Sequence, residues 1–234
     1  MTAIEVEHLR KRYGAKVAVD DISFAVAEGE IFGLLGRNGA GKSTTVDCIA
    51  GLRRADSGRI RVAGLDPRRD RGEVRQLLGV QLQEADLPDK LTVAEAMRLY
   101  ASFYARAADT AGLLDALDLT EKRNTRYRRL SGGQKQRLSI ALALVGRPRI
   151  AILDELTTGL DPVARRDTWA LVNDIRNQGV TIMLVTHFME EAERLCDRVA
   201  ILDAGRVAAI GSPAELGRPS LEDTFVALTS RRVS

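Results

Sequence analysis

The sequence predicts an α/β fold in which an antiparallel β-lobe leads into a mainly parallel, buried sheet. Two observations predict it. Apolar and polar residues alternate at 4–7 and 22–26, as in strands with one solvated face. Apolar runs at 31–35 and 150–153, and the mostly apolar segment 180–186, are typical of parallel strands covered on both faces.

Composition restricts the class of protein. The chain has 234 residues, 45% of them hydrophobic and 29% charged, which suits a globular protein with a substantial core. No apolar run approaches the ~20 residues that span a bilayer, and the N-terminus lacks the basic-then-apolar plan of a signal peptide. We therefore expect a cytosolic chain that does not cross a membrane alone. Cys48 and Cys196 lie beside apolar residues, which predicts small buried hydrophobes without disulfide or metal chemistry.

The net charge is +3, with a pI of about 9.0. Its basic residues are scattered instead of forming one stripe, so we interpret them as a solvated, mixed-charge surface and expect no nucleic-acid partner. They include Arg53, Arg54, Arg68, Arg69, Arg71, Arg126, Arg128 and Arg129.

The N-terminal lobe is expected to hold strands at 4–7, 17–19 and 22–26, divided by turn residues around Gly14 and at Asp20-Asp21. Tyr13 lies in the first turn region. An aromatic ring there can stack on a base, and packing is the alternative interpretation.

A phosphate-binding loop follows the strand at 31–35. The segment fits G-x-x-x-x-G-K-[ST], in which glycines permit close backbone approach and the next helix directs its free N–H groups at a phosphate. A cation at the lysine position suits the β/γ-phosphates, and the next hydroxyl suits Mg²⁺. A Gly-rich turn before a helix is the alternative, disfavoured by the preceding strand. The loop comprises Gly36, Arg37, Asn38, Gly39, Ala40, Gly41, Lys42, Ser43 and Thr44.

The helix that begins near Lys42 is expected to end at Gly51, with strands at 59–62 and 80–83 after it. The second of these strands runs toward a polar loop at 84–90. A glutamine at the end of this strand can reach a metal-bound water, although such a residue is more often on the surface. Thr92 and Glu95 form a capping box that opens a helical region reaching about residue 119.

A second Gly-rich helix start follows Leu130. Ser131 and Gln134 form a capping box, and apolar spacing over 138–145 indicates a buried helix face. The capping box does not explain Gly132 and Gly133, which cost up to ~1 kcal/mol each in a helix. Uncovered N–H groups there let a phosphate approach the helix end.

Three further candidates stand at or beyond strand ends. Asp154-Glu155 follows a buried strand, which suggests one carboxylate near Mg²⁺ and one near an attacking water, against the alternative of a solvated acidic turn. Asp161 can merely cap the next helix, with Pro162 at its first position. His187 ends the strand at 180–186, where a structural histidine is the alternative.

Together these motifs resemble the ATP-binding subunit of ABC transporters, over nearly the entire chain. The resemblance implies a P-loop NTPase fold: an antiparallel β-lobe, a mainly parallel RecA-like core sheet and a helical signature subdomain at about 84–147. It implies a single domain over 1–234 with a short C-terminal helix at about 220–230.

The resemblance also implies residue roles with ATP and Mg²⁺ as cofactors. Tyr13 matches the aromatic that stacks on adenine, Glu155 the catalytic carboxylate, and His187 the histidine that holds the γ-phosphate and water. Gln83 matches the glutamine that links Mg²⁺ to the membrane-subunit contact, and we prefer it to Gln81 because it immediately precedes the polar loop. The implied catalytic set is Lys42, Gln83, Glu155 and His187, and the implied metal set is Ser43, Gln83 and Asp154.

Two such subunits pack head to tail in the family, so the signature of one completes the ATP site of the other. The resemblance implies a second ATP-binding subunit, expected to be identical, and an integral membrane permease at the cytoplasmic face of the membrane; the isolated subunit is expected to be soluble. The residues expected to meet the partner's ATP are Ser131, Gly132, Gly133 and Gln134, with Asp161 near the interface.

One position departs from the family pattern: Leu156 stands where proline usually follows the catalytic glutamate. This affects the backbone orientation of Glu155 but removes no side-chain chemistry.

Segments 79–84, 91–95 and 221–225 resemble exporters of the daunorubicin-resistance type, so we expect export of a drug, antibiotic or other hydrophobic compound. The alternatives are a soluble ABC ATPase acting on ribosomes or nucleic acid and a nucleotide-binding module that does not hydrolyse. The usual second cassette or long inserted coiled coil of the former is absent, and Glu155 and His187 disfavour the latter.

Overall fold

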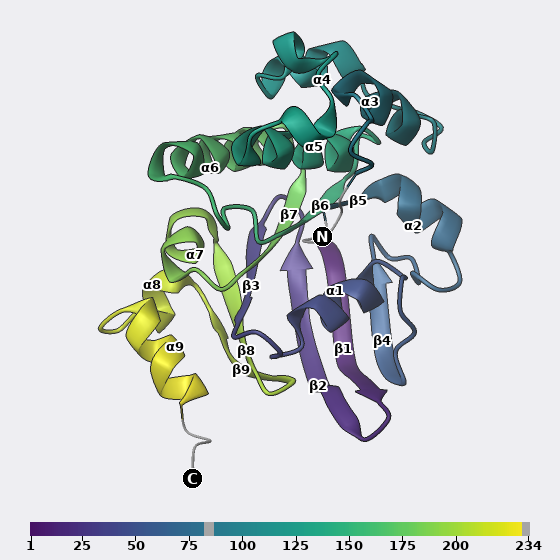
Figure 1. Ribbon diagram of the computed structural model, residues 1–234. Helices are drawn as coiled ribbons and strands as arrows, with labels where there is room; N and C mark the ends of the chain where they lie inside the picture. The colour runs from purple at the N-terminus through teal and green to yellow at the C-terminus, as the bar shows by residue number, and fades with distance from the viewer. Residues whose placement is uncertain (82–86, 231–234) are drawn as a thin grey trace. The chain divides into compact units, whose positions relative to one another are not determined.

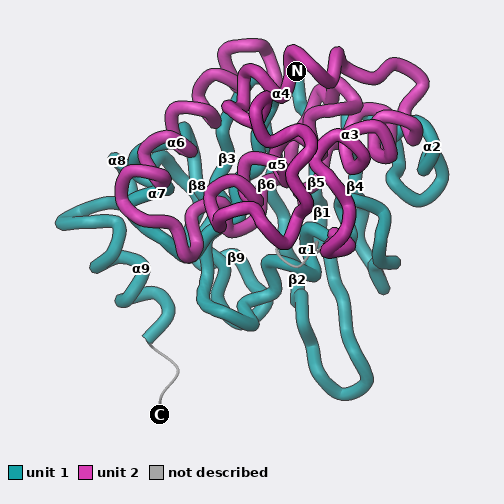
Figure 2. The backbone as a smooth tube through the Cα atoms, turned by 45° about the horizontal axis from the view of Figure 1, so that its top comes forward, with its two compact units in different colours: residues 1–74, 181–234 teal, residues 75–180 magenta. Residues whose placement is uncertain are grey.

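The computed structural model describes residues 1–81 and 87–230. The chain divides into two compact units, one made of 1–74 and 181–234 and the other of 75–180 (Figure 2). The first unit is rich in strands, whereas helices dominate the second.

The first unit contains the predicted antiparallel β-lobe. Strands β1 (Thr2–Tyr13), β2 (Lys16–Ala27) and β4 (Ser57–Val62) pair in the order β2-β1-β4 (Figure 1). The predicted break at Asp20-Asp21 is wrong, because β2 continues through it as one strand. Asp21 adopts a φ of +68°, and the register with β1 shifts on either side of Leu9, so the polar pair marks an irregularity within the strand.

The same unit contains four strands that follow one another across a sheet in the order β7-β3-β8-β9. Strands β3 (Ile31–Gly36) and β7 (Thr181–Thr186) are buried at every residue, and β3 runs parallel to both β7 and β8 (Arg198–Asp203). Strand β9 (Arg206–Gly211) pairs antiparallel with β8, so the two form a hairpin. Phe24 of the β-lobe stacks on Phe32 of β3 at 5.3 Å between ring centroids, which ties the lobe to the sheet.

The described residues of this unit also form the helices α1 (Lys42–Ile49), α7 (Met189–Leu195), α8 (Pro213–Leu216) and α9 (Leu221–Thr229). Helix α2 (Arg71–Leu77) leads along the chain into the second unit.

The second unit is built around a parallel pair of strands, β5 (Leu78–Gln81) and β6 (Ile150–Asp154). Strand β5 begins two residues before the predicted strand, and residues 82 and 83 lie outside the described part. Gly79 passes so close to Ala143 that a Cβ would meet its carbonyl oxygen, so α5 packs tightly on β5. The helices are α3 (Val93–Ala101), α4 (Thr110–Ala116), α5 (Gly132–Leu144) and α6 (Pro162–Asn177), with short 3₁₀ turns η1 (Thr120–Lys122) and η2 (Tyr127–Arg129).

Several local predictions are confirmed. The capping box of Thr92 and Glu95 opens α3, and Leu138 and Ala141 are buried on α5. Both cysteines are buried and unbridged.

In the described ranges, no helix is both long and apolar enough to span a bilayer.

Candidate functional site

The phosphate loop leaves the buried strand β3 and enters α1 through glycines that no other residue can replace without strain. Gly41 has a φ of +104°, and a Cβ there would lie 2.5 Å from the carbonyl oxygen of Ala18. Gly41 is the N-cap of α1, with no side-chain cap hydrogen bond, and the first turn carries no acidic residue. The helix start therefore presents its positive end without a competing anion.

Lys42 and Ser43 lie side by side at that helix start. The Lys42 side chain is buried, and its Nζ donates to the carbonyl oxygens of Gly36 at 2.7 Å and Arg37 at 3.2 Å. Ser43 is exposed, while the Thr45 hydroxyl donates back to Gly41 O at 2.9 Å. The loop thus holds a cation and an accessible hydroxyl close together. Of the other loop residues, Asn38 and Gly39 are exposed, Ala40 is buried and Thr44 is half-buried.

His187 emerges at the same sheet edge as the phosphate loop. Leu35 of β3 pairs with Thr186 of β7 in parallel register, so Gly36 and His187 continue from neighbouring strands. The His187 ring is half-buried, 4.1 Å from the Phe188 ring. This placement allows contact with a ligand beyond the strand ends.

Tyr13 ends β1 as an exposed aromatic ring. Its exposed fraction is 42%, and Lys11 Nζ lies 5.4 Å from the ring centroid. The ring is therefore accessible for stacking, with a cation on one face.

The two predicted carboxylates end β6 in the second unit. Asp154 and Glu155 are both buried. The Gln81 side chain, also buried, accepts a hydrogen bond from Asp154 N at 3.0 Å through its Oε1. Gln83, the preferred glutamine of the sequence analysis, lies outside the described residues, so its role stays a prediction.

Glu155 has an unusual backbone. Its φ of +49° is left-handed, a conformation that costs a residue with a Cβ roughly 1–2 kcal/mol. The hydroxyl of Thr158 donates to Glu155 Oε2 at 3.4 Å. Sequence reasoning missed both features, because neither glutamate nor the Leu156-Thr157-Thr158 segment carries a turn signal.

The signature residues line a cleft of about 340 Å³ within the second unit. The capping box is confirmed: Gln134 N donates to Ser131 Oγ at 3.2 Å, and Ser131 N donates to Gln134 Oε1 at 3.0 Å. Nothing lies within 4 Å of the position a Cβ would take on Gly132, and Gly133 meets only Ala164 Cβ, at 3.8 Å. The 13-residue helix α5 therefore opens with an uncrowded first turn.

Asp161 lines the same cleft and caps α6. Its Oδ1 accepts from Ala164 N at 3.0 Å and Val163 N at 2.9 Å, and these backbone hydrogen bonds hold the pKa of Asp161 below its usual value. The capping role is confirmed. Arg137, which the sequence analysis did not single out, also lines the cleft and pairs with Asp118 at 2.7 Å and Asp167 at 3.3 Å.

Comparison with known proteins assigns this arrangement to a family. The family model described as ABC transporter matches residues 19–158. The chain is 43% identical to Nod factor export ATP-binding protein I of Rhizobium etli, over 92% of this chain and 70% of that protein. It is 38% identical to linearmycin resistance ATP-binding protein LnrL of Bacillus subtilis, over 97% of this chain and 74% of that protein.

Comparison with solved structures leads to the same family and fold. A structure described as the ATP binding subunit of an ABC transporter matches with a TM-score of 0.87 and 32% identity, over 97% of this chain and 99% of that one. A dimeric ATP-binding cassette bound to ADP and Pi matches with a TM-score of 0.79, over 89% of this chain and 98% of that one; at 24% identity it supports the fold alone. The predicted fold class is confirmed.

Proposed function

Because the chain belongs to the ABC transporter family, as an ATP-binding subunit whose ATPase activity is coupled to transport, we propose that two copies of it enclose two ATP molecules between them. Each ATP lies between the phosphate loop of one copy and the signature cleft of the other. The observation that supports this is that one chain presents both a cradle built around Lys42 and an open cleft lined by Ser131 and Gly132. We further propose that residues 1–234 act as one ATP-binding domain.

Residues of the first unit bind the nucleotide in this proposal. Tyr13 stacks on adenine with its exposed ring, and the N–H groups at the start of α1 receive the phosphates. Lys42 exchanges its hydrogen bonds to Gly36 and Arg37 for phosphate oxygens, since charge-assisted bonds are the stronger ones. His187 contacts the γ-phosphate from the neighbouring strand.

The donor set fits Mg²⁺, which prefers oxygen ligands and retains waters and substrate phosphates. Ser43 offers an exposed hydroxyl, and Asp154 offers a carboxylate at a strand end. Gln83 is the proposed third residue, with Gln81 as the competitor because its side chain contacts Asp154 N. The ion, when bound, neutralises charge on the phosphates.

Glu155 orients and polarises the attacking water. A general base typically contributes ~10²–10⁴-fold, and a carboxylate is a weak base for water, so positioning by the fixed backbone matters as much as proton transfer. Lys42 and His187 stabilise the charge that develops on the phosphoryl oxygens.

The signature cleft supplies the remaining donors. Ser131 Oγ accepts the Gln134 N–H, which leaves its own proton to donate to a phosphate oxygen. Gly132 lets a phosphate approach the first turn of α5, and Asp161 lies beside it at the proposed dimer contact.

The transport partner is proposed to be an integral membrane permease bound at the cytoplasmic face of the membrane. Two relatives are named for Nod factor export and for linearmycin resistance, which supports export of a drug, antibiotic or other hydrophobic compound. The alternative is a soluble ABC ATPase that acts on ribosomes or nucleic acid. Affinity purification from detergent-solubilised native membranes separates them: a stoichiometric polytopic protein is expected, and ribosomal proteins or DNA without it would overturn the transport role.

The enclosed-ATP mechanism is tested with Glu155→Gln, which keeps the size of the side chain and removes its charge. We expect it to retain ATP binding, lose turnover and accumulate as a dimer, measured by light scattering at saturating ATP. Ser131→Arg in the same background is the control, because it fills the cleft and is expected to restore the monomer. A Glu155→Gln chain that stays monomeric at saturating ATP contradicts the mechanism.

A further inference from the structure

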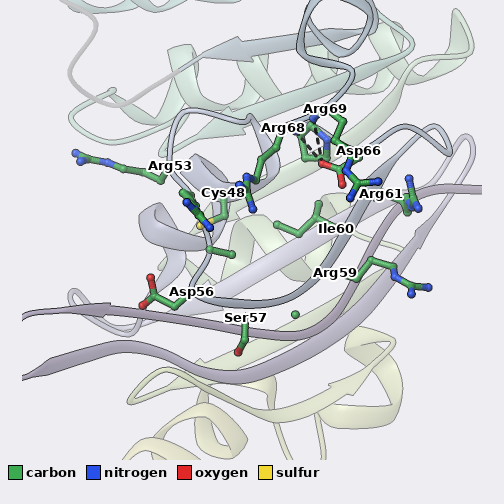
Figure 3. Close-up of a pocket in the computed structure, with 14 residues that line it drawn as sticks. Cys48, Arg53, Asp56, Ser57, Arg59, Ile60, Arg61, Asp66, Arg68 and Arg69 are labelled. Atoms are coloured by element: carbon green, nitrogen blue, oxygen red, sulfur yellow. Dashed lines mark hydrogen bonds between the residues drawn. The ribbon is translucent and has the colours of Figure 1, made fainter.

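An arginine-rich cleft lies in the first unit, between the segment that follows α1 and strand β4, with a volume of about 320 Å³ (Figure 3). None of the proposed ATP-site residues lines it. Six arginines and two aspartates do, so its formal charge is +4. The arginines are Arg53, Arg54, Arg59, Arg61, Arg68 and Arg69.

The two carboxylates of this cleft are already engaged. Asp56 accepts from Lys11 Nζ at 2.8 Å and from Arg12 N at 2.7 Å. Asp66 accepts from the backbone N–H groups of Arg68 at 2.9 Å and Arg69 at 3.4 Å, not from their guanidinium groups. These hydrogen bonds hold the pKa of both aspartates below the usual value, so both carry their charge at neutral pH.

The arginines fall into two groups. Arg53 and Arg59 extend to opposite sides in Figure 3 and pair with Asp47 at 3.4 Å and Glu7 at 3.8 Å. For the other four, no carboxylate oxygen of the described residues lies within 4.0 Å of a guanidinium nitrogen. These four are Arg54, Arg61, Arg68 and Arg69. Four like charges in one cleft repel one another, and a bound anion would relieve that repulsion.

The chemistry of the lining selects the anion. Guanidinium presents a planar fork of donors that matches phosphate oxygens bidentately. The apolar lining consists of small or aliphatic side chains such as Ile60 and Pro67, without an aromatic ring on which a base would stack. We propose that this cleft binds a compact polyanion through its phosphoryl groups, supplied either by a soluble polyphosphate or by a lipid headgroup.

The cleft and the phosphate loop lie toward opposite ends of one helix. Lys42 opens α1 and Cys48 lines the cleft in its last turn, six residues later, which is about 9 Å along a helix axis. A binding experiment must therefore separate the two sites, and a chain with Lys42→Ala does so by removing the cation of the loop.

The first experiment titrates tripolyphosphate into the full chain carrying Lys42→Ala, by isothermal calorimetry. We expect one binding event, weakened at least tenfold by adding Arg54→Gln and Arg68→Gln. Both side chains are exposed and unpaired with carboxylates of the described residues, so the fold should tolerate the changes. Arg71→Gln with Arg106→Gln is the matched control, since it removes the same charge from exposed residues outside the cleft. If the cleft variant fails to fold, Arg69→Gln alone replaces it.

The second experiment identifies the source of the phosphoryl group by cosedimentation with vesicles of phosphatidylcholine containing phosphatidic acid. Vesicle binding that the cleft variant loses and the control keeps assigns a headgroup. Tripolyphosphate binding without vesicle binding assigns a soluble ligand. Binding of neither probe, or equal weakening in the cleft and control variants, overturns the proposal and leaves the arginines as the solvated surface predicted from the sequence.

Discussion

The left-handed backbone of Glu155 makes a sharp prediction about stability. At an ordinary position, glycine is less stable than alanine by about 0.5–1 kcal/mol, because it loses more backbone freedom on folding. At a φ of +49° the order should reverse, because a Cβ in the left-handed region costs about 1–2 kcal/mol. We therefore expect Glu155→Gly to be more stable than Glu155→Ala by about 1 kcal/mol.

The comparison is made between two variants that both lack the carboxylate. The hydrogen bond from Thr158 to Glu155 Oε2 is lost in each and cancels from the difference. Glu121, an exposed residue of η1, provides the control pair, since its φ lies outside the positive range found at Glu155. There Glu121→Ala should be the more stable variant.

Thermal unfolding followed by circular dichroism measures both pairs. A difference of 1 kcal/mol corresponds to roughly 2–4 °C in Tm for a chain of this size. The expected result is a change of sign: glycine melts higher at 155 and alanine melts higher at 121. If alanine melts higher at both positions, the backbone of Glu155 stores no left-handed strain and the reasoning is refuted.

Three further predictions follow from local geometry. Gly41→Ala should abolish ATP binding in calorimetry, because its Cβ meets Ala18 O. Gly72→Ala is the control: Gly72 lies outside the proposed site, its Cβ meets nothing within 4 Å, and the variant should bind ATP as the parent chain does. Equal binding by both variants contradicts the loop geometry. Ser131→Ala should lower the free energy of unfolding by about 1 kcal/mol, because α5 loses its N-cap hydrogen bond. Ser131→Asp keeps a side-chain acceptor and should not lower it. Equal Tm values for the two variants would count against the capping box. Burial raises the pKa of the Cys48 thiol from 9.0 to about 11, so this thiol ionises at a lower pH in the unfolded chain than in the folded one. The contribution of Cys48 to the free energy of unfolding should be complete below pH 9.0 and should fall as the pH rises toward about 11. Cys48→Ala should remove this decline. A variant with the same pH profile as the parent chain argues against a buried neutral thiol.

The parts of the site that sequence reasoning located are those encoded locally. A strand, a Gly-rich loop and Lys42 follow one another directly, so the order of residues alone defines the cradle. The capping boxes at Thr92 and Ser131 each join residues three apart, within one helical turn. Such signals do not depend on how distant segments pack.

The features that sequence reasoning missed depend on distant partners. Asp20-Asp21 carries turn propensity, yet pairing with β1 keeps it inside a 12-residue strand. Likewise, the contact from Gln81 to Asp154 joins residues 73 apart, and no local pattern marks it. The arginine cleft is gathered from a loop, a strand and a second loop between residues 53 and 69, so the sequence presents it as scattered charge.

The left-handed backbone of Glu155 also bears on the proposal that two adjacent carboxylates serve one site. In a continuing strand, consecutive side chains point to opposite faces, so Asp154 and Glu155 would diverge. The left-handed turn at Glu155 ends β6 at Asp154 and breaks that alternation. Leu156 follows with its side chain fully buried. We expect this burial to restrict the turn by packing, at the position where a proline ring would restrict it covalently. In the proposed mechanism, burial of the Leu156 side chain therefore takes the place of the fixed φ of proline in orienting Glu155, the carboxylate that we propose to be catalytic.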